Sequence, residues 1–435
     1  MVGRTLAMER PASTAVALPC AVAQAESHKG EDCAARFEEG GELHGFAIYD
    51  GHGGPDCARY CAHEDTGFLP SLLRGRASLP EAEAIADVFW AADAECGAWL
   101  AARGGHGRDG GGAHAGSTAT LLMVQRLAAG SSTGVGMAGG GFRCRFAWVG
   151  DSMALTVDMA TGKMIDHTLI HCPDRADEVA NLRLMSKAGK ELPRGRKADR
   201  KKKAGAPEAA ELDPATATTA EVAAAMLGEL EEEEEEEELP ITAAGVGAAC
   251  KRAGVLPSAG CPPELMLRAF AREQLINTVI PKGRKYRRNA CIFRRPRKKD
   301  ENMPMVVATH EDPYSSHYRD LLMTRSICDW TKSAWVLPQP DVATFEVPNG
   351  KHVRALIASD GLWDICSWEN ACDILRAART PQEAADALLE VAKGVYQGER
   401  GLEKMGDDTT VMVIDLLPGG PASAVKPKGG GCTLS

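Results

Sequence analysis

The chain contains the stretch FAIYDGHGG at residues 46–54, in which an apolar run ends at Asp50 and glycines follow. Three further stretches also join an apolar run to an aspartate: FAWVGDS at 146–152, LIASDGLWD at 356–364 and GDDTTVMVIDL at 406–416. In the first three the strand-like run leads into the acid, whereas in the fourth Asp407 and Asp408 come before it. Because antiparallel neighbours place the end of one strand beside the start of the next, all four turns can meet at one edge of a sheet core.

Four acidic turns at one sheet edge indicate a cation site. Carboxylates packed closely repel one another and resist ionisation. A divalent cation that prefers oxygen ligands relieves this repulsion. The sequence therefore predicts a hard-metal site built from aspartates, with Asp50, Asp151, Asp360 and Asp407 at its turns.

The composition permits a large globular core and narrows the class of protein. Of the 435 residues, 44% are hydrophobic, and the 46 glycines indicate long loops. The net charge of −10 argues against nucleic acid as a partner. Fourteen cysteines without a secretory signal are typical of reduced thiols in the cytosol or nucleus. None has zinc-ligand spacing, and Cys57 and Cys61, four apart on an expected helix, are interpreted as packing residues. No apolar stretch approaches membrane-spanning length.

The charge pattern divides the chain. We expect an N-terminal extension at 1–24, one domain at 25–417, and a flexible tail at 418–435. Residues 191–304 interrupt the domain as a charged, largely disordered insertion, because runs of like charge repel themselves. Helix is expected to persist there only at 220–230 or 264–280. The runs themselves are basic at 194–203, acidic at 231–238 and basic again at 282–299.

Periodicity and turn residues predict regular structure on both sides of the insertion. The expected helices cover 54–64, 80–103, 367–378 and 381–396. The expected strands cover 42–50, 116–125, 352–359 and 409–416, and a hairpin joins 142–149 to 154–158 through the tight turn Gly150–Ser152.

The motifs DGHGG, GSTAT, GDS, TRSICD, DGLWD and GDDTTV follow one another along the chain. In this order they resemble the metal-dependent protein phosphatases of the PPM type, the protein phosphatase 2C family, over roughly residues 25–190 and 305–417. The resemblance implies an α+β fold in which a sandwich of two antiparallel β-sheets is flanked by α-helices in four αββα layers. It also implies two Mg²⁺ or Mn²⁺ ions at one end of the sandwich, and hydrolysis of phosphoserine and phosphothreonine esters by a metal-bridging water or hydroxide.

The resemblance assigns a role to each matching residue. Asp50 would bridge the two ions, and His52 would protonate the leaving alkoxide, which suits an imidazole near neutral pH. The remaining direct ligands would be the carbonyl of Gly51 and the carboxylates of Asp360 and Asp407. Four further acids would hold metal-bound waters or a third, weaker ion: Glu31, Asp32, Asp151 and Asp364.

The chain departs from the family pattern at several positions. Ser27 stands where the family usually has a phosphate-gripping arginine, and Lys29 or His28 are the candidates to replace it. Lysine is a point charge and cannot match a bidentate arginine. The other departures are Met153 after GDS, Asp408 in place of asparagine, and Ile327-Cys328 in place of the glycine before Asp329.

The chain ends in Cys432-Thr433-Leu434-Ser435, which fits a prenylation box with a preference for farnesyl. Four-residue matches also arise by chance. A single prenyl chain at Cys432 would give only reversible membrane association. Otherwise we expect a monomer in the cytosol or nucleus, with phosphoproteins as its substrates.

Two other functions stay open on the sequence alone. The first is a catalytically silent relative that binds phosphoproteins or acts as a scaffold, which Ser27 favours and the intact aspartates oppose. The second is a two-metal hydrolase of a small phosphate ester, although no P-loop or base-binding motif is present. The main hypothesis is a metal-dependent protein serine/threonine phosphatase.

Overall fold

The computed structural model describes eleven parts of the chain. They are residues 18–103, 115–128, 140–190, 243–256, 258, 260–279, 292–294, 306–308, 321–330, 335–399 and 405–418. Several predicted features lie outside them: the runs at 194–203 and 231–238, the helix at 220–230, most of the basic run at 282–299, and Cys432.

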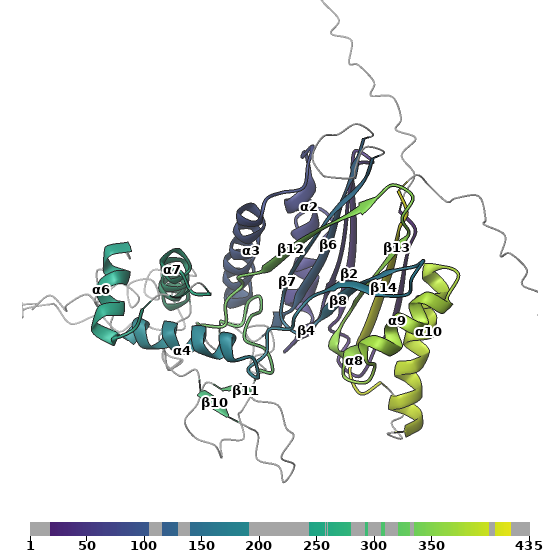
Figure 1. The fold of residues 1–435 in the computed structure, drawn as a ribbon. Helices are drawn as coiled ribbons and strands as arrows, with labels where there is room; N and C mark the ends of the chain where they lie inside the picture. Colours follow the sequence, from purple (N-terminus) through teal and green to yellow (C-terminus); the bar gives the residue numbers. More distant parts are fainter. Residues whose placement is uncertain are drawn as a thin grey trace, which may run out of the picture.

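Two antiparallel five-stranded sheets form the centre of the protein (Figure 1). The first has the order β1-β14-β13-β8-β9, with bounds Cys20–Ala25, Thr409–Leu416, Val353–Ala358, Met153–Asp158 and Met164–His167. The second has the order β12-β7-β6-β3-β2, with bounds Asp341–Pro348, Gly141–Val149, Ala119–Leu127, Leu43–Tyr49 and Cys33–Glu39. Two short ribbons pair β4 (Gly51–His52) with β5 (Gly116–Ser117) and β10 (Ile292–Arg294) with β11 (Val306–Ala308).

Helices cover both outer faces of the sheet pair (Figure 1). On the second sheet these are α1 (Asp56–Cys61), α2 (Phe68–Leu73) and α3 (Ala82–Arg103). On the first sheet they are α8 (Asp360–Trp363), α9 (Trp368–Ala377) and α10 (Pro381–Lys393), and a π-helical turn at Gly394–Glu399 continues α10. The predicted four-layer αββα fold is confirmed.

The alternation of side chains along each strand builds the layers. In β3, Phe46 and Ile48 enter the cluster between the sheets, whereas Ala47 and Tyr49 face the helices. In β14, Met412 and Ile414 point between the sheets, and their neighbours pack against α10. Both faces of these strands are therefore buried, which explains why their sequences are continuous apolar runs.

The predicted hairpin between 142–149 and 154–158 is wrong. Strand β7 pairs with β12 and β6, whereas β8 pairs with β13 and β9, so the turn carries the chain from one sheet to the other. Gly150 has φ +99°, and a Cβ there would lie 2.6 Å from the Thr118 methyl carbon. A tight glycine turn can join two strands that pair in one sheet, and it can equally join strands of two different sheets. The sequence of the turn therefore does not tell which of the two arrangements forms.

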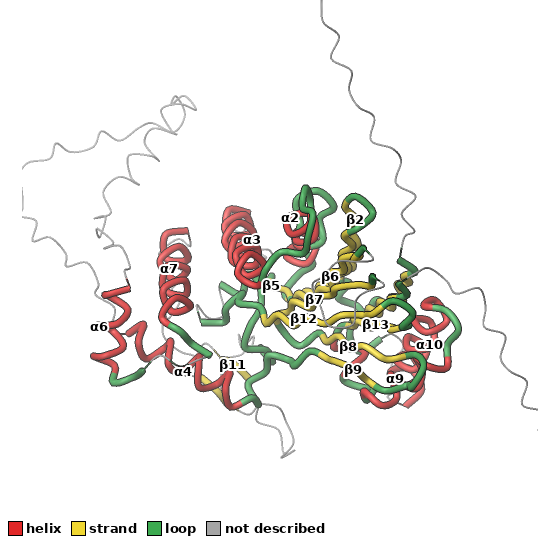
Figure 2. Tube along the Cα trace, turned by 45° about the horizontal axis from the view of Figure 1, so that its top comes forward, coloured by secondary structure: helices red, strands yellow, loops and turns green. Residues whose placement is uncertain are grey.

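Three helices form a separate cluster beyond α3, on the side away from α9 and α10 (Figure 2). They are α4 (Ala176–Lys190), α6 (Ala243–Ala253) and α7 (Pro263–Val279), and they share an apolar core with Trp335. Arg272 of α7 bonds Asp93 of α3 through Nε and Oδ2 at 2.7 Å, with both side chains buried. The helix predicted at 264–280 is confirmed as α7.

The structure adds detail at the edges of the expected domain. Strand β1 begins at Cys20, inside the expected N-terminal extension, and pairs along its length with β14. The expected insertion at 191–304 contains α6 and α7, which are folded. None of the helices in the described part of the chain is long and apolar enough to cross a membrane.

Candidate active site

The acidic turns named by the sequence gather at one end of the sandwich. In the first sheet, Ala358 pairs with both Val411 and Met153, so the turns that carry Asp360, Asp407 and Asp151 lie side by side. In the second sheet, Tyr49 pairs with Cys33, which places the turn of Asp50 beside the segment of Glu31 and Asp32. The labels β4 and α8 mark this end of the two sheets in Figure 1.

Two carboxylates form the centre of the cluster. Asp50 and Asp360 lie close enough to share a hydrogen bond. Burial raises the pKa of both groups well above the usual value, and the neighbouring carboxylates raise it further. Each therefore resists ionisation in the absence of a cation.

Asp32 and Asp151 flank this centre, and the pKa of each is raised as well. Burial raises the pKa of each to about 6. Oδ2 of Asp32 accepts hydrogen bonds from the hydroxyls of Ser359 and Thr410, both at 2.8 Å. Oδ1 of Asp151 is buried and has no hydrogen-bond donor among the residues that the structure describes. A buried carboxylate oxygen without a donor is a site that a cation would satisfy.

Lys29 already brings one positive charge to the cluster. Its ammonium donates to both carboxylate oxygens of Asp407, at 2.7 and 2.8 Å. Burial alone would lower the pKa of Lys29, but the bond to Asp407 and the charges of Asp360 and Asp50 raise it instead. Lys29, which was predicted to bind substrate phosphate, is therefore bonded to Asp407, a predicted metal ligand. The other phosphate candidate, His28, is exposed.

Asp408 holds the loop from which Lys29 extends. It is 2% exposed, and it accepts hydrogen bonds from the backbone N–H groups of Ser27 and Glu31, both at 2.6 Å. Burial alone would raise its pKa, but these donors outweigh burial and lower it. The carboxylate that departs from the family pattern is therefore an anchor for the loop. Glu31 in turn accepts from the N–H of Gly54 through Oε1 at 2.6 Å.

His52 is oriented by an aspartate that the sequence interpretation gave no role. Nε2 of His52 lies 2.8 Å from Oδ2 and 2.9 Å from Oδ1 of Asp329. Asp329 is 1% exposed and also accepts from the hydroxyl of Ser326. A Cβ on Gly116, which pairs with His52, would lie 2.4 Å from Nε2, so only glycine fits beside this contact.

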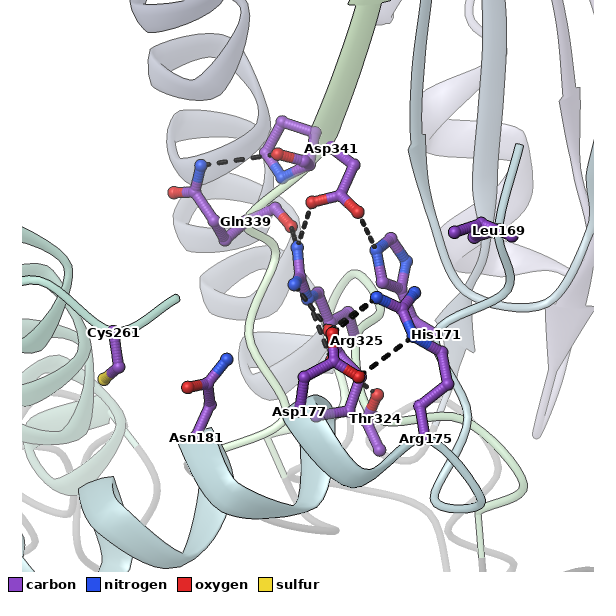
Figure 3. A network of polar contacts seen from close by, with 12 residues as sticks. Leu169, His171, Arg175, Asp177, Asn181, Cys261, Thr324, Arg325, Gln339 and Asp341 are labelled. Atoms are coloured by element: carbon purple, nitrogen blue, oxygen red, sulfur yellow. Dashed lines mark hydrogen bonds and ion pairs between the residues drawn. The ribbon is translucent and has the colours of Figure 1, made fainter. Parts of the chain in front are cut away.

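The segment that carries Asp329 is fixed from behind by a polar network (Figure 3). Arg325 forms a two-pronged ion pair with Glu178 of α4, at 2.6 and 3.0 Å, and a second pair with Asp341 at 2.8 Å. Asp341 also contacts Nε2 of His171 at 3.1 Å. His171 in turn accepts from the N–H of Gly150 through Nδ1 at 3.2 Å. The network therefore ties the segment of Asp329 to the turn of Asp151.

The sequence interpretation missed most of the residues that support the acids. Thr118 accepts from the N–H of Asp50 at 3.1 Å, and Ser359 and Thr410 orient Asp32. Each belongs to a quoted motif, but a motif does not say which hydroxyl faces which carboxylate. Asp329 is the last residue of the TRSICD segment, one of the quoted motifs. Its position at the end of that segment was the available signal. Asp364 lies on the exposed side of the α8 turn.

The family model and the curated relatives that match the chain are all described as protein phosphatase 2C. Residues 315–397 match the family model of Protein phosphatase 2C, a segment that includes Asp329 and Asp360 but not Asp50, Asp151 or Asp407. The chain is 34% identical over 108 residues to "Probable protein phosphatase 2C 12" of Arabidopsis thaliana, covering 25% of this chain and 23% of that protein. It is 33% identical over 154 residues to "Protein phosphatase 2C 50" of Oryza sativa subsp. japonica, covering 29% of this chain and 37% of that protein.

Among solved structures, the chain is similar to a serine-threonine phosphatase 2C from Toxoplasma gondii. The TM-score is 0.47 and the identity is 15%, over 92% of this chain and 98% of that chain. The curated relatives match the chain over well under half of their own lengths.

We predict that Asp408→Ala destabilises the protein by about 2 kcal/mol, since two buried N–H groups lose a charged acceptor. Urea unfolding followed by circular dichroism measures the loss. The loss shrinks as the pH falls, because a lowered carboxyl pKa contributes stability only while the group is ionised. Asp373→Ala on the exposed side of α9 is the control and should change stability by less than about 0.5 kcal/mol. Equal effects of the two substitutions would contradict the anchoring role.

Proposed function

We propose that the chain is a member of the protein phosphatase 2C family and acts as a metal-dependent protein serine/threonine phosphatase, which the matches to that family's model and to its curated members support. The observation that carries the proposal is the convergence of Asp50, Asp151, Asp360 and Asp407 at one end of the sandwich, beside His52. The crowding that raises the carboxyl pKa values, and the donor-free oxygen of Asp151, fit a site for divalent cations. Phosphoproteins are the proposed substrates.

The proposed ligand set is the one that the family resemblance implies, and the position of the acids at one end of the sandwich supports it. Asp50, the carbonyl of Gly51, Asp360 and Asp407 would hold two ions, Mg²⁺ or Mn²⁺. Glu31 and Asp32 would hold their waters, and Asp151 with Asp364 a third ion. When bound, such ions neutralise the charge of a phosphate ester and lower the pKa of a water.

The protein's own groups would position the substrate and move the proton. His52 would donate a proton to the serine or threonine oxygen as it leaves. Asp329 would hold the imidazole ring in place through Nε2, and the network around Arg325 would hold the segment of Asp329. With Ser27 in place of an arginine, substrate phosphate would depend on the cations and on Lys29, once Lys29 has left Asp407.

A catalytically silent relative is the second candidate function. The specific observation in its favour is the ammonium of Lys29 on Asp407, which occupies a predicted metal ligand. A protein in which this contact persists would bind phosphoproteins without turning them over. Turnover separates the two candidates.

We predict that the purified protein hydrolyses a phosphothreonine peptide with Mn²⁺ or Mg²⁺, and that a chelator abolishes the reaction. Asp360→Asn should lower turnover by about 100-fold or more, since even the partners of metal ligands are worth about 10–100-fold. Phosphate release measures the rate. Asp373→Asn, an exposed change on α9, is the matched control and should leave the rate unchanged. No turnover by folded wild-type protein over a wide range of metal concentrations would favour the silent relative.

A second prediction concerns the orientation of His52. Asp329→Asn keeps the shape of the side chain but removes its charge, so kcat on the peptide should fall about 10–100-fold while KM and the Mn²⁺ requirement stay unchanged. An aryl phosphate with a good leaving group needs no protonation and should lose much less. Combining Asp329→Asn with His52→Ala should add little to His52→Ala alone. Equal losses on both substrates would show that Asp329 acts only on the fold.

A third prediction concerns Lys29. Lys29→Met removes a cation that competes for Asp407, so the Mn²⁺ concentration for half-maximal thermal stabilisation should fall about two- to fivefold. Lys351→Met is the control, because Lys351 pairs with Asp158 outside the site at 3.5 Å. If Lys29 serves only substrate phosphate, the Mn²⁺ dependence will not move and only KM will rise.

A further inference from the structure

Three cysteines from separate parts of the chain meet in the interior, outside the carboxylate cluster. Cys57 lies on α1, Cys96 on α3, and Cys328 in the segment before Asp329. Their sulfur atoms all lie within 4.8 Å of one another. Cys57 and Cys96 are 0% exposed and Cys328 is 3% exposed. Buried cysteines commonly act as small apolar residues, but a mutual cluster of three thiols also has the geometry of a metal-binding triad.

The spacing is close to what a bound ion requires. A zinc–sulfur distance of about 2.3 Å places the sulfurs of a tetrahedral or trigonal site about 3.8–4.0 Å apart. Contraction of the cluster by less than about 1 Å therefore forms the site. The present polar contacts of two of the sulfurs are weak and easily exchanged. Cys57 Sγ donates to the carbonyl of Ile327 and Cys328 Sγ to that of Asp93, each at 3.7 Å.

The backbone at Cys328 is strained. Its φ is +66°, and it is the one non-glycine residue with a positive φ in the described part of the chain. Glycine adopts this conformation without cost, whereas a residue with a Cβ is disfavoured by about 1 kcal/mol or more. The residue with this strained backbone is one of the three in the thiol cluster.

The protonation of the cluster suits a soft cation. The neighbouring Cys328 and Cys57 side chains lower the pKa of Cys96 to about 5. Burial raises the pKa of Cys57 and of Cys328 well above the usual value. Binding of a divalent ion would release the protons still held by the three sulfurs to solvent and form three metal–thiolate bonds.

We propose that Cys57, Cys96 and Cys328 form a buried structural site for a thiophilic d¹⁰ ion of the Zn²⁺ class. Cys61, one turn further along α1, shares a thiol hydrogen bond with Cys57 and is a candidate for a fourth ligand. The pair Cys57 and Cys61, interpreted from sequence as packing, would thus be half of the ligand set. The proposal is independent of the phosphatase activity, since oxygen-binding Mg²⁺ and Mn²⁺ do not favour thiolates.

The position of the site gives it a structural consequence. An ion there would join α1, α3 and the segment of residues 321–330 at Cys328. The next residue, Asp329, is the partner of His52. The ion would therefore fix the backbone beside the contact that orients the imidazole.

The test uses the full-length protein with Cd²⁺ as the probe, because thiolate-to-cadmium charge transfer absorbs in the ultraviolet and carboxylate ligands give no such band. Since the site is buried, the chain is refolded under reducing conditions with Cd²⁺ present and then desalted. We expect a charge-transfer band with one tightly held Cd²⁺ per chain. Refolding with Zn²⁺ in place of Cd²⁺ should give one tightly held Zn²⁺ per chain and no band, because Zn²⁺–thiolate bonds do not absorb at these wavelengths.

Variants assign the ligands. Cys96→Ser should abolish the band, whereas Cys372→Ser, at a buried cysteine of α9, should keep it. Cys61→Ser should reduce the band only if that thiol is the fourth ligand. Refolded wild-type protein without a charge-transfer band would overturn the proposal whether or not any variant folds. So would a band that persists in folded Cys96→Ser, or a disulfide between two of the three cysteines in place of bound metal.

Discussion

Repulsion among buried carboxylates at one end of the sheet sandwich is the constraint around which the surrounding loops are built. Asp50 and Asp360 share a hydrogen bond, and burial with neighbouring charges raises the pKa of both. The protein offsets part of this cost with its own groups. Two hydroxyls donate to Asp32, two backbone N–H groups donate to Asp408, and the ammonium of Lys29 lies on Asp407. After these contacts, Asp151 still has a buried oxygen without a donor among the described residues. A cation bound among the carboxylates would satisfy that oxygen and relieve the repulsion.

The sandwich makes this arrangement possible through its registers. Ala358, at the end of β13, pairs with Val411 near the start of β14 and with Met153 at the start of β8. The three acidic turns of this sheet therefore lie side by side. The turn at Gly150 then crosses between the sheets and brings the second sheet into the same site. Behind the site, Arg325 connects α4 to the segment of Asp329. The positions of the acids and the orientation of His52 therefore depend on contacts from both sheets and from α4.

Much of this could be predicted from the sequence because it follows from local patterns. The apolar runs next to Asp50, Asp360 and Asp407 predicted strands, and antiparallel pairing predicted that their turns meet. The partner of each strand could not be predicted in the same way, and the hairpin between β7 and β8 was wrong for that reason. The contact of Lys29 with Asp407 and that of Asp329 with His52 span 378 and 277 residues of sequence. Only the packed fold brings such distant groups together, so the sequence named these residues without pairing them.

The most direct test of the account is anomalous scattering from crystals of the protein grown with Mn²⁺ at neutral pH. The account predicts anomalous peaks bounded by Asp50, Asp360 and Asp407, with the ammonium of Lys29 displaced from Asp407. Crystals without anomalous density among these carboxylates, and with Lys29 still bonded to Asp407, would contradict it.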